Sequence, residues 1–563
     1  MSEIKLHNDR AIEITVQLLK EHGIKYIVIS PGGTNIQLVK MVQNDPFFTC
    51  YSVVDERSAI YFAIGLYLQT GKIIATSCTS AQATRNYMPG LTEAHYKRVP
   101  ILAITMEKHK RFVGQEYMQA PNQVSVPKDC VKNTYELPFV SSVHDEYHCV
   151  RLVNEAILEL THNGFGPVQL CIPRLDFKTS EFGVSTRKIG IFQHGNFPHY
   201  SFGTKKVLIL IGEHRRFSPK EKEAIERFSN SVNCVIYCNN LSNYHGNYCI
   251  FANLEFTCMD IFTFAKEYAP DILITIGGQT GDYPIYLMLS KPELKQVEHW
   301  RVNEDGKIID TYDKLTRVYQ SDLISFFNFY SEEVETSHDY YYLFNKLIKK
   351  TNKDIELPFS NAYLAQRISN ILPDNSVVQF SILNSLRVWN LFKLSESITC
   401  YSNVGAFGID GGLSTLIGQS VATDNLCFMI IGDLASYYDM NSLGIRHIKD
   451  NVRILLINNN GGVEFKLNDS NHTQVDKFIA ASNHFKNARG WADTCGFRYI
   501  GVSNKEELEE CINEFVSPSN KSIVLEAFIL DSDDYKGYRL LLDKNRDISL
   551  SEVFKNKIKK IVK

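Results

Sequence analysis

The stretch "MIIGDLASYYDMNSLGIRHIKDNVRILLINNNGGVEF", residues 429–465, contains two apolar runs that each end in polar residues and glycine. The runs are typical of buried strands, and the segment between them is long enough for the helical connection that joins two parallel strands. In parallel sheets, ligands gather at the carboxyl ends of the strands. If the two strands are neighbours, Asp433 and the asparagines at 458–460 therefore meet at one edge of the sheet.

The same alternation of apolar runs and amphipathic stretches continues along the chain and predicts α/β architecture. We expect three doubly wound parallel-sheet domains, at residues 1–185, 186–350 and 351–563, with an irregular linker over 174–204. The first and third blocks share one pattern, which fits an old duplication. The predicted strands of these two blocks are 26–30, 50–54, 73–77, 101–105 and 168–172, then 376–380, 398–402, 426–431, 453–457 and 523–528.

Bulk composition argues against several classes of function. The 563 residues are too many for one hydrophobic core, and a net charge of −3 gives no support for binding nucleic acid or anionic membranes. The first 30 residues carry charges throughout, unlike a signal peptide, and no uncharged apolar run reaches transmembrane length. The thirteen cysteines are scattered without a CxxC pair, which favours reduced core cysteines over a metal site. We therefore expect a cytoplasmic protein.

Asp433 and the residues after the second strand offer the ligands that a hard cation requires. Carboxylate, amide and backbone carbonyl oxygens suit Mg²⁺ or Ca²⁺, and Mg²⁺ often completes its shell with substrate phosphates. Gly461 and Gly462 would let the backbone approach such an ion closely. Taken alone, Asp433 is better explained as a helix cap and the asparagines as a turn. The pairing of Gly-Asp with Asn-Asn, 25 residues further on, favours a metal and diphosphate site.

This paired motif resembles the diphosphate- and Mg²⁺-binding motif of thiamin diphosphate enzymes. That family also requires a glutamate that reaches the aminopyrimidine ring of the cofactor from the first domain. The sequence "VVDERSAIYFAIG", residues 53–65, places Glu56 after a predicted strand and at the start of a helix. The alternative is a first-turn glutamate that simply interacts with the helix dipole. Together with the third-domain motif, the catalytic interpretation is favoured.

Longer stretches narrow the resemblance to one branch. "DERSA" (55–59), "TEAHYKRVPILAIT" (92–105) and "GIDGGLST" (408–415) look like the 2-succinyl-5-enolpyruvyl-6-hydroxy-3-cyclohexene-1-carboxylate (SEPHCHC) synthases. The similarity spans almost the whole chain, in the order pyrimidine-binding, central and diphosphate-binding domain. Those enzymes decarboxylate 2-oxoglutarate and add the product to isochorismate, with the cofactor held between two subunits. The resemblance therefore implies thiamin diphosphate, Mg²⁺ and a homodimer or homotetramer.

The resemblance also implies roles for individual residues. Glu56 would activate the cofactor, and Asn122 and Gln123 match an active-site Asn-Gln pair. Ile409 would be an apolar prop under the bent cofactor. The implied Mg²⁺ ligands are Asp433, Asn460 and the carbonyl of Gly462. Other implied contacts to the cofactor are Ser385, Gly432, Leu434 and Phe465.

The substrate-binding arginines of that family are largely replaced. Thr34 and Val404 stand where arginines are expected, and another expected arginine falls on Trp389. Losing one charge-assisted contact costs about 1.5–3 kcal/mol, so losing several should abolish useful binding of two dianionic substrates. The candidate substrate-binding residues are these replacements and nearby polar or cationic residues, with Glu464 in place of an apolar residue: Thr34, Arg85, Lys108, Arg387, Trp389 and Glu464.

We therefore predict a thiamin diphosphate-dependent enzyme that decarboxylates a 2-oxo acid and transfers the acyl unit to an acceptor. A small donor such as pyruvate and a polar acceptor such as a sugar derivative fit the replaced residues. One alternative is a genuine SEPHCHC synthase whose substrates bind relocated arginines. Another is a non-catalytic paralogue, which the intact cofactor motifs argue against. The central block contains no GxGxxG fingerprint that would indicate a flavin.

Overall fold

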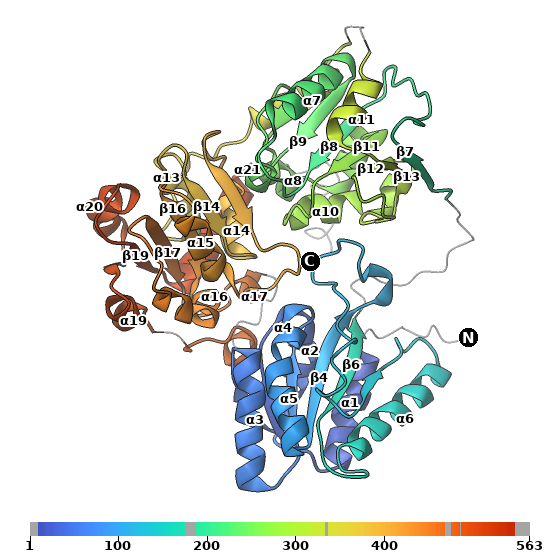
Figure 1. The fold of residues 1–563 in the computed structure, drawn as a ribbon, viewed down its shortest axis with the longest axis vertical. Helices are drawn as coiled ribbons and strands as arrows, with labels where there is room; N and C mark the ends of the chain where they lie inside the picture. The colour runs from blue at the N-terminus through green and yellow to red at the C-terminus, as the bar shows by residue number, and fades with distance from the viewer. Residues whose placement is uncertain (1–8, 175–186, 333–335, 468–473, 485, 547–563) are drawn as a thin grey trace, which may run out of the picture.

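Three parallel β-sheets flanked by helices make up the chain (Figure 1). The computed structural model describes residues 9–174, 187–332, 336–467, 474–484 and 486–546. The first sheet lies at the bottom of Figure 1, the central sheet at the top and the third sheet at the left. The predicted fold class, α/β with three doubly wound parallel sheets, is confirmed.

The first sheet has six strands in the order β2-β1-β3-β4-β6-β5. Every neighbouring pair is parallel, and β4 is buried along almost its whole length, which explains its continuous apolar sequence. The elements are α1 (Arg10–Glu21), β1 (Tyr26–Ile29), α2 (Ile36–Asn44), β2 (Thr49–Ser52), α3 (Glu56–Thr70), β3 (Ile74–Cys78), α4 (Gln82–Asn86), α5 (Met88–Lys97), β4 (Ile101–Lys108), β5 (Thr134–Glu136), α6 (Val143–Glu159) and β6 (Val168–Arg174).

The third sheet repeats this order strand for strand, as β15-β14-β16-β17-β19-β18. Its strands β16 and β17 are parallel neighbours, with Gly432 opposite Ile457, so the predicted meeting of two strand ends at one edge is confirmed. The elements are α12 (Asp339–Ile348), α13 (Asn361–Ile368), β14 (Val377–Phe380), α14 (Asn384–Trp389), β15 (Thr399–Ser402), α15 (Gly412–Val421), β16 (Cys427–Gly432), α16 (Asp433–Tyr438), β17 (Val452–Asn458), α17 (Glu464–Leu467), α19 (Arg489–Thr494), β18 (Arg498–Val502), α20 (Lys505–Val516), β19 (Ile523–Phe528) and α21 (Asp531–Asn545).

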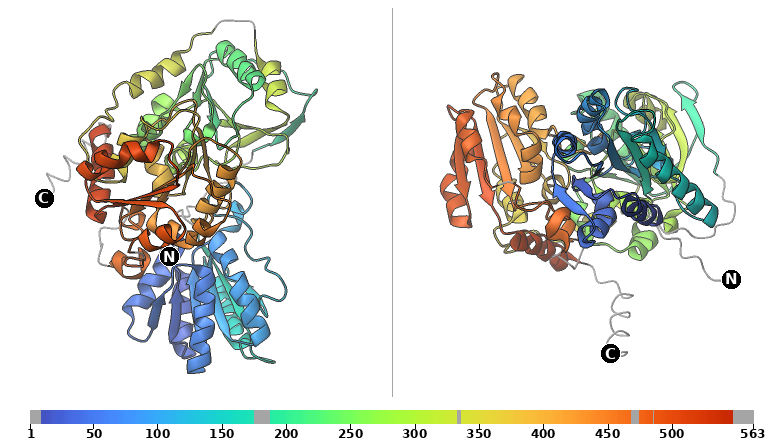
Figure 2. Two further views of the ribbon diagram at one scale, coloured as in Figure 1. Left: turned by 60° about the vertical axis from the view of Figure 1, so that its left-hand side comes forward. Right: turned by 90° about the horizontal axis from the view of Figure 1, so that it is seen from below.

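The central sheet has seven strands in the order β10-β9-β8-β11-β12-β13-β7. Its elements are β7 (Gly190–Gln193), β8 (Val207–Ile211), α7 (Pro219–Ser231), β9 (Cys234–Tyr237), β10 (Cys249–Ile250), α8 (Asn253–Cys258), α9 (Ile261–Thr263), β11 (Ile272–Ile276), α10 (Tyr283–Leu289), β12 (Glu298–Val302), β13 (Leu315–Gln320) and α11 (Leu323–Tyr330). Seen from below in Figure 2, the first domain lies beside the third.

The structure corrects the predicted linker over 174–204. Residues 190–193 form β7, which pairs with β13 at the edge of the central sheet, while residues 175–186 lie outside the described residues. A four-residue edge strand with alternate exposed positions carries too weak an apolar pattern to be recognised from sequence. The short edge strands β5 and β18 were missed for the same reason. In the described part of the chain, no helix combines the length and apolarity needed to cross a membrane.

Candidate active site

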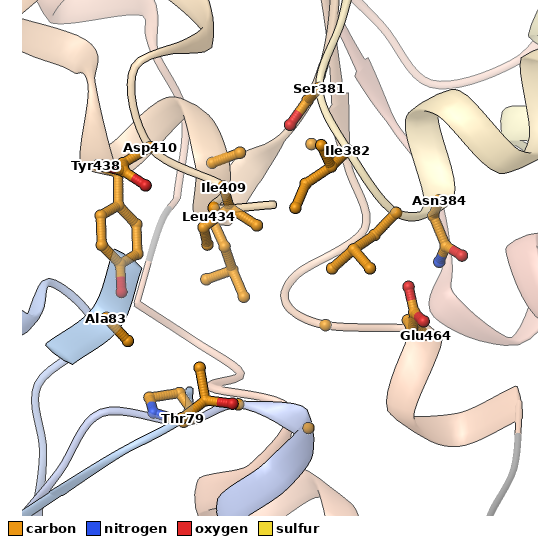
Figure 3. Close-up of a pocket in the computed structure, with 18 of the residues that line it drawn as sticks. Thr79, Ala83, Ser381, Ile382, Asn384, Ile409, Asp410, Leu434, Tyr438 and Glu464 are labelled. Atoms are coloured by element: carbon orange, nitrogen blue, oxygen red, sulfur yellow. The ribbon is translucent and has the colours of Figure 1, made fainter. Parts of the chain in front are cut away.

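A cavity of about 220 Å³ opens between the carboxyl ends of the first and third sheets (Figure 3). The first sheet contributes the loops after β1, β2 and β3, and the third sheet contributes the loops after β14, β15, β16 and β17. Tyr283, from the start of α10 in the central domain, also lines it. This is the edge at which parallel sheets characteristically bind ligands.

Glu56 is buried in the wall of this cavity, at the first residue of α3. Asp55 caps the helix by accepting two backbone N–H groups of the first turn, which fixes Glu56 at the strand–helix junction. The Tyr438 hydroxyl donates to Glu56 Oε2 at 2.8 Å. Burial raises the pKa of Glu56 to about 7, although hydrogen bonds from Tyr438 and Asn86 oppose this. A carboxyl group with this pKa can exchange a proton with a ring nitrogen near neutral pH.

Asp433 is the first residue after β16 and is only 2% exposed. Its Oδ1 accepts from the Leu434 N–H at 2.7 Å, and its Oδ2 accepts from the Gly461 N–H at 2.8 Å. The carboxylate therefore joins the end of β16 to the turn after β17. Burial raises the pKa of Asp433 to about 7 despite these bonds. Because its hydrogen-bond partners are backbone N–H groups, its charge remains available to a cation.

The three asparagines after β17 have different partners. Asn458 donates to a glutamate of the neighbouring strand β19. Asn459 lines the cavity and donates its amide N–H to Asp534 at 2.8 Å, which leaves the side-chain oxygen for a ligand. Asn460 has a φ of +63°, and its side chain bonds to Asn483 in a separate cavity. The structure therefore brings Asn459, and not the predicted Asn460, to the cavity that Asp433 lines.

Two glycines shape the turn that follows these asparagines. Gly461 has a φ of +135°, and a Cβ there would lie 2.6 Å from the Ala480 carbonyl, so only glycine fits without strain. Gly462 donates its N–H to the same carbonyl at 2.6 Å. Both glycines line the cavity, and the Gly461 N–H is the one bonded to Asp433. The Gly461 peptide is thus tied directly to the carboxylate.

Ile409 and Leu434 project into the middle of the cavity (Figure 3). They separate the end at which Tyr438 lies from the end formed by Asn384 and Glu464. An apolar wall at this point can support a bent organic molecule without offering it a hydrogen bond. The remaining residues predicted to contact a cofactor line the same cavity: Ser385, Gly432 and Phe465.

Five residues predicted from the first domain are not among those that line the cavity: Thr34 and Lys108, which line only a wider cleft beside it, and Arg85, Asn122 and Gln123. The Gln123 amide is buried, accepts from the Ala81 N–H at 2.8 Å and donates to the Met106 carbonyl at 2.6 Å. Asn122 is exposed and its side chain caps a turn, while its carbonyl accepts from Arg85, which is also exposed. These last three residues support the loop after β3, and their predicted catalytic and substrate-binding roles stay predictions.

Three side chains stand where arginines were expected, and all three contact other parts of the protein. Trp389 is fully buried and donates its indole N–H to Asn361 at 3.1 Å, and its predicted contact with substrate stays a prediction. Val404 is part of the hydrophobic core. The Thr34 hydroxyl bonds to Thr79 at 2.8 Å and so joins the loops after β1 and β3. No cation from these three positions enters the cavity.

Arg387 and Glu464 form an ion pair at the end of the cavity opposite Tyr438. Arg387 Nη2 donates to Glu464 Oε1 at 2.8 Å, and the two side chains are only 16% and 19% exposed. Burial is the largest influence on the pKa of Arg387 and lowers it, but the charge interactions with Glu464, Tyr538 and Tyr283 and the hydrogen bond to Glu464 together raise the pKa overall. Arg387 is therefore neutralised by the residue that replaces an apolar side chain of the family pattern.

A wider cleft of about 860 Å³ shares Gly33, Gln119, Tyr283, Glu464 and Phe465 with the cavity. Its walls come from all three domains. They carry the cationic residues Lys108, Arg174, Lys291, Arg387 and Arg539. The scarcity of cations predicted from sequence thus applies to the inner cavity and not to this outer cleft.

Several residues of the cavity were not singled out from the sequence. Tyr438 bonds to Glu56 across 382 residues of chain, and no local pattern could indicate that contact. Asn86 stands in a helix in which the sequence indicated no cofactor contact, and Asn384 begins the helix in which only Ser385, Arg387 and Trp389 were singled out. Asn459 belongs to the recognised Asn-Asn-Asn motif. It is the first residue after β17, and this position distinguishes it from Asn458 and Asn460.

Both halves of the cavity belong to one chain in this structure. Tyr438 from the third domain contacts Glu56 and the Val54 carbonyl from the first, so the two sheets meet without a second subunit. The resemblance instead predicts a site shared between subunits. The oligomeric state therefore stays a prediction.

Comparison with known proteins adds independent findings. Residues 9–126 match the family described as thiamine pyrophosphate enzyme, N-terminal TPP binding domain. The chain is 34% identical to the SEPHCHC synthase of Phocaeicola vulgatus over 91% of this chain and 94% of the relative. It is 31% identical to the synthase of Bacteroides thetaiotaomicron over 94% and 97% of the two chains. The synthase of Flavobacterium psychrophilum is 30% identical over 91% and 94%.

Proposed function

Because the chain belongs to the SEPHCHC synthase family of thiamin diphosphate-dependent enzymes, we propose that it decarboxylates a 2-oxo acid and joins the acyl unit to an acceptor. One observation carries this proposal. A single cavity is lined by Glu56 from the first domain, by Asp433 and Asn459 from the third, and by two apolar side chains that project into its middle.

The residues present fit Mg²⁺ and a diphosphate. Asp433 would supply a carboxylate oxygen, Asn459 its amide oxygen and Gly461 its backbone carbonyl, which are hard oxygen ligands of the kind Mg²⁺ prefers. Asp534 supports this assignment, because it accepts the Asn459 amide N–H and so leaves the amide oxygen available to a ligand. This set keeps the predicted Asp433, but it replaces the predicted Asn460 with Asn459 and the predicted Gly462 with Gly461.

Glu56 is the proposed proton-transfer residue. When bound, thiamin diphosphate supplies a thiazolium carbon that accepts the electrons released as CO₂ leaves. The Glu56 carboxyl group would hold a proton at the aminopyrimidine nitrogen, and its pKa of about 7 suits that exchange. Ile409 and Leu434 would support the bent cofactor and exclude water from the reacting carbon.

We propose that the substrates differ from those of the SEPHCHC synthases. Trp389 and Val404 are buried in the core and Thr34 is bonded to a neighbouring loop, so three expected arginines have no replacement at the inner cavity. A small 2-oxo acid with one carboxylate, such as pyruvate, places fewer demands on cationic partners than 2-oxoglutarate does.

The main alternative is SEPHCHC synthesis itself. The names of the relatives support it, and so do the cations of the outer cleft, among them Lys108 and Arg174. A non-catalytic role is less well supported, because Glu56 is held buried and bonded at the wall of the cavity.

We also propose that the chain forms at least a homodimer. Helix α3 exposes Tyr61, Phe62 and Leu68, with exposed fractions of 46%, 41% and 61%. Large apolar residues grouped on one helix are typical of a surface that another chain covers. Analytical ultracentrifugation of the wild type and of Phe62→Asp would test this, and a wild-type monomer would contradict it.

The function is tested by offering the protein several donors. Purified protein with thiamin diphosphate and Mg²⁺ would be incubated with pyruvate, with 2-oxobutanoate, and with 2-oxoglutarate plus isochorismate, and CO₂ release and products would be measured. We expect CO₂ from a small 2-oxo acid. Release of CO₂ from 2-oxoglutarate with SEPHCHC as product would support the alternative, and no CO₂ from any donor would contradict the proposal.

A further inference from the structure

The Arg387–Glu464 pair leaves specific hydrogen-bonding groups unused at the end of the cavity opposite Glu56. Glu464 uses Oε1 to accept from Arg387, while its Oε2 is buried without a hydrogen-bond partner among the described residues. Buried carboxylate oxygens are normally paired, and an unpaired one on a cavity wall indicates that a ligand supplies the donor. A carboxylate ligand cannot do so, because it offers only acceptors.

Arg387 and Asn384 supply the complementary groups. Arg387 Nη1 donates to Asn384 Oδ1 at 3.3 Å, and the guanidinium carbon lies 5.4 Å from the centre of the Tyr283 ring, which fixes its plane. A guanidinium has five N–H donors, so donors beyond those used by Glu464 and Asn384 remain. Asn384 and Glu464 face each other across this end of the cavity (Figure 3).

The charge of this end of the cavity also restricts the ligand. Glu464 neutralises Arg387 at 2.8 Å, so a second anion would meet the Glu464 carboxylate as well as the arginine. Adding an unmatched charge to a buried, neutral pair is unfavourable. The pair itself therefore favours a ligand that is neutral where it contacts the pair and that presents both hydrogen-bond donors and acceptors. Hydroxyl groups do both.

We propose that the Arg387–Glu464 pair and Asn384 bind adjacent hydroxyl groups of the acceptor, which is a polyhydroxylated aldehyde or ketone. This inference rests on the proposed function, because it identifies the acceptor class of the same site. Glu464 Oε2 accepts from one hydroxyl, and Arg387 donates to the oxygen of its neighbour. The apolar residue of the family pattern at position 464 could neither accept that hydrogen bond nor neutralise Arg387, so Glu464 is the residue that sets this specificity.

Two aldehydes of equal carbon number test the proposal. With pyruvate as donor, kcat/KM would be measured for D-glyceraldehyde and for propanal, which lacks both hydroxyl groups. We expect the wild type to prefer D-glyceraldehyde by about tenfold or more, since a site built for hydroxyl groups rejects an analogue without them. Glu464→Ile should abolish that preference, and Glu464→Gln, which keeps the size of the side chain, should reduce it. The control is Glu514→Gln, which breaks an exposed ion pair with Arg498 and should leave the preference unchanged.

A binding experiment separates this proposal from the proposed function. Saturation-transfer NMR would compare erythritol with 1-butanol in the presence of wild-type or variant protein, without turnover. We expect contact signals from erythritol that weaken in Glu464→Ile and Glu464→Gln and persist in Glu514→Gln. Absence of CO₂ release with this binding pattern intact would contradict only the enzymatic function. Equal use of both aldehydes by the wild type, or an unchanged preference in both Glu464 variants, would overturn the inference.

Discussion

The first and third sheets have the same strand order and use their strand ends differently. The residue that follows β3 is Thr79, whose hydroxyl bonds to Thr34, whereas the residue that follows the matching strand β16 is Asp433. After β2 the chain places Glu56, and after the matching strand β15 it places a loop that leads to Ile409. The strands of the two sheets are arranged alike, and the chemistry differs at a few residues just beyond them.

Because of this difference, the two domains contribute different chemical groups to the cavity. The third-sheet side offers oxygen ligands for a cation, and the first-sheet side offers an acid whose pKa is raised to about 7. Ligands bind at the carboxyl ends of strands in both sheets, so substitutions at matched ends should have unequal effects.

The largest expected effect is that of Glu56→Gln. Glutamine keeps the size of the side chain but cannot transfer a proton, so CO₂ release from the 2-oxo acid should fall by about 100–1,000-fold. Cofactor affinity, measured by isothermal titration, should change by less than about threefold, since the cation ligands are elsewhere. Asp55→Asn is the control: asparagine caps a helix about as well as aspartate, so this variant should keep most of the activity. Equal losses in both variants would contradict the assignment.

A smaller effect is expected for Asp433→Asn, measured as affinity for thiamin diphosphate in the presence of Mg²⁺. Removing the only charged ligand should weaken binding by about 100-fold, the upper end of what changes outside the ligand shell produce. Thr79→Val, at the matched strand end of the first sheet, should weaken it by less than about threefold, because it removes only a hydroxyl contact. If the two variants behaved alike, the division between the sheets would be refuted.

A still smaller effect is expected from the two neighbouring asparagines Asn459 and Asn460, which should differ in their effect on cofactor binding. Asn459→Ala removes the amide oxygen at the cavity and should weaken Mg²⁺-dependent cofactor binding by about 10-fold. Asn460→Ala should change it by less than about threefold, because that side chain bonds to Asn483 outside the cavity. The reverse order of effects would restore the ligand set predicted from sequence.

The smallest effect concerns pH. The folded pKa of Glu56 lies above its usual 4.5, so its contribution to stability is full below about pH 4.5 and is lost as the pH rises through 7. Tyr438 lowers that pKa by donating a hydrogen bond to the carboxylate. In Tyr438→Phe, the pH at which this contribution to stability is lost should therefore rise by less than about one pH unit. Urea unfolding of the cofactor-free protein between pH 5 and 9 measures this, with Tyr437→Phe as the control. A downward shift would contradict the stated role of the hydroxyl.

Much of the fold was predictable, because parallel strands that are buried on both faces have continuous apolar sequences. Glu56 and Asp433 were predictable for a related reason, since polar residues at the ends of such runs lie where ligands bind. The choice between Asn459 and Asn460 was not, because it depends on where β17 ends and on a φ of +63° at Asn460.

Contacts between distant segments set the limit of sequence-based prediction. Arg387 and Glu464 were each noted as candidates, yet their pairing joins residues 77 positions apart and changes the charge of the site. Trp389 aligned with a family arginine, and only packing shows that it lies in the core, bonded to Asn361. The position of a residue in a motif therefore predicts where the residue lies in the fold, but it does not predict the direction of its side chain.

The most direct test of the central claim is a crystal structure of the protein with thiamin diphosphate and Mn²⁺, with the ion located by anomalous scattering. The account predicts an ion coordinated by Asp433, Asn459 and the Gly461 carbonyl, and an aminopyrimidine ring within hydrogen-bonding distance of Glu56. An ion bound elsewhere, or a pyrimidine ring remote from every Glu56 carboxyl group in the assembly, would contradict it.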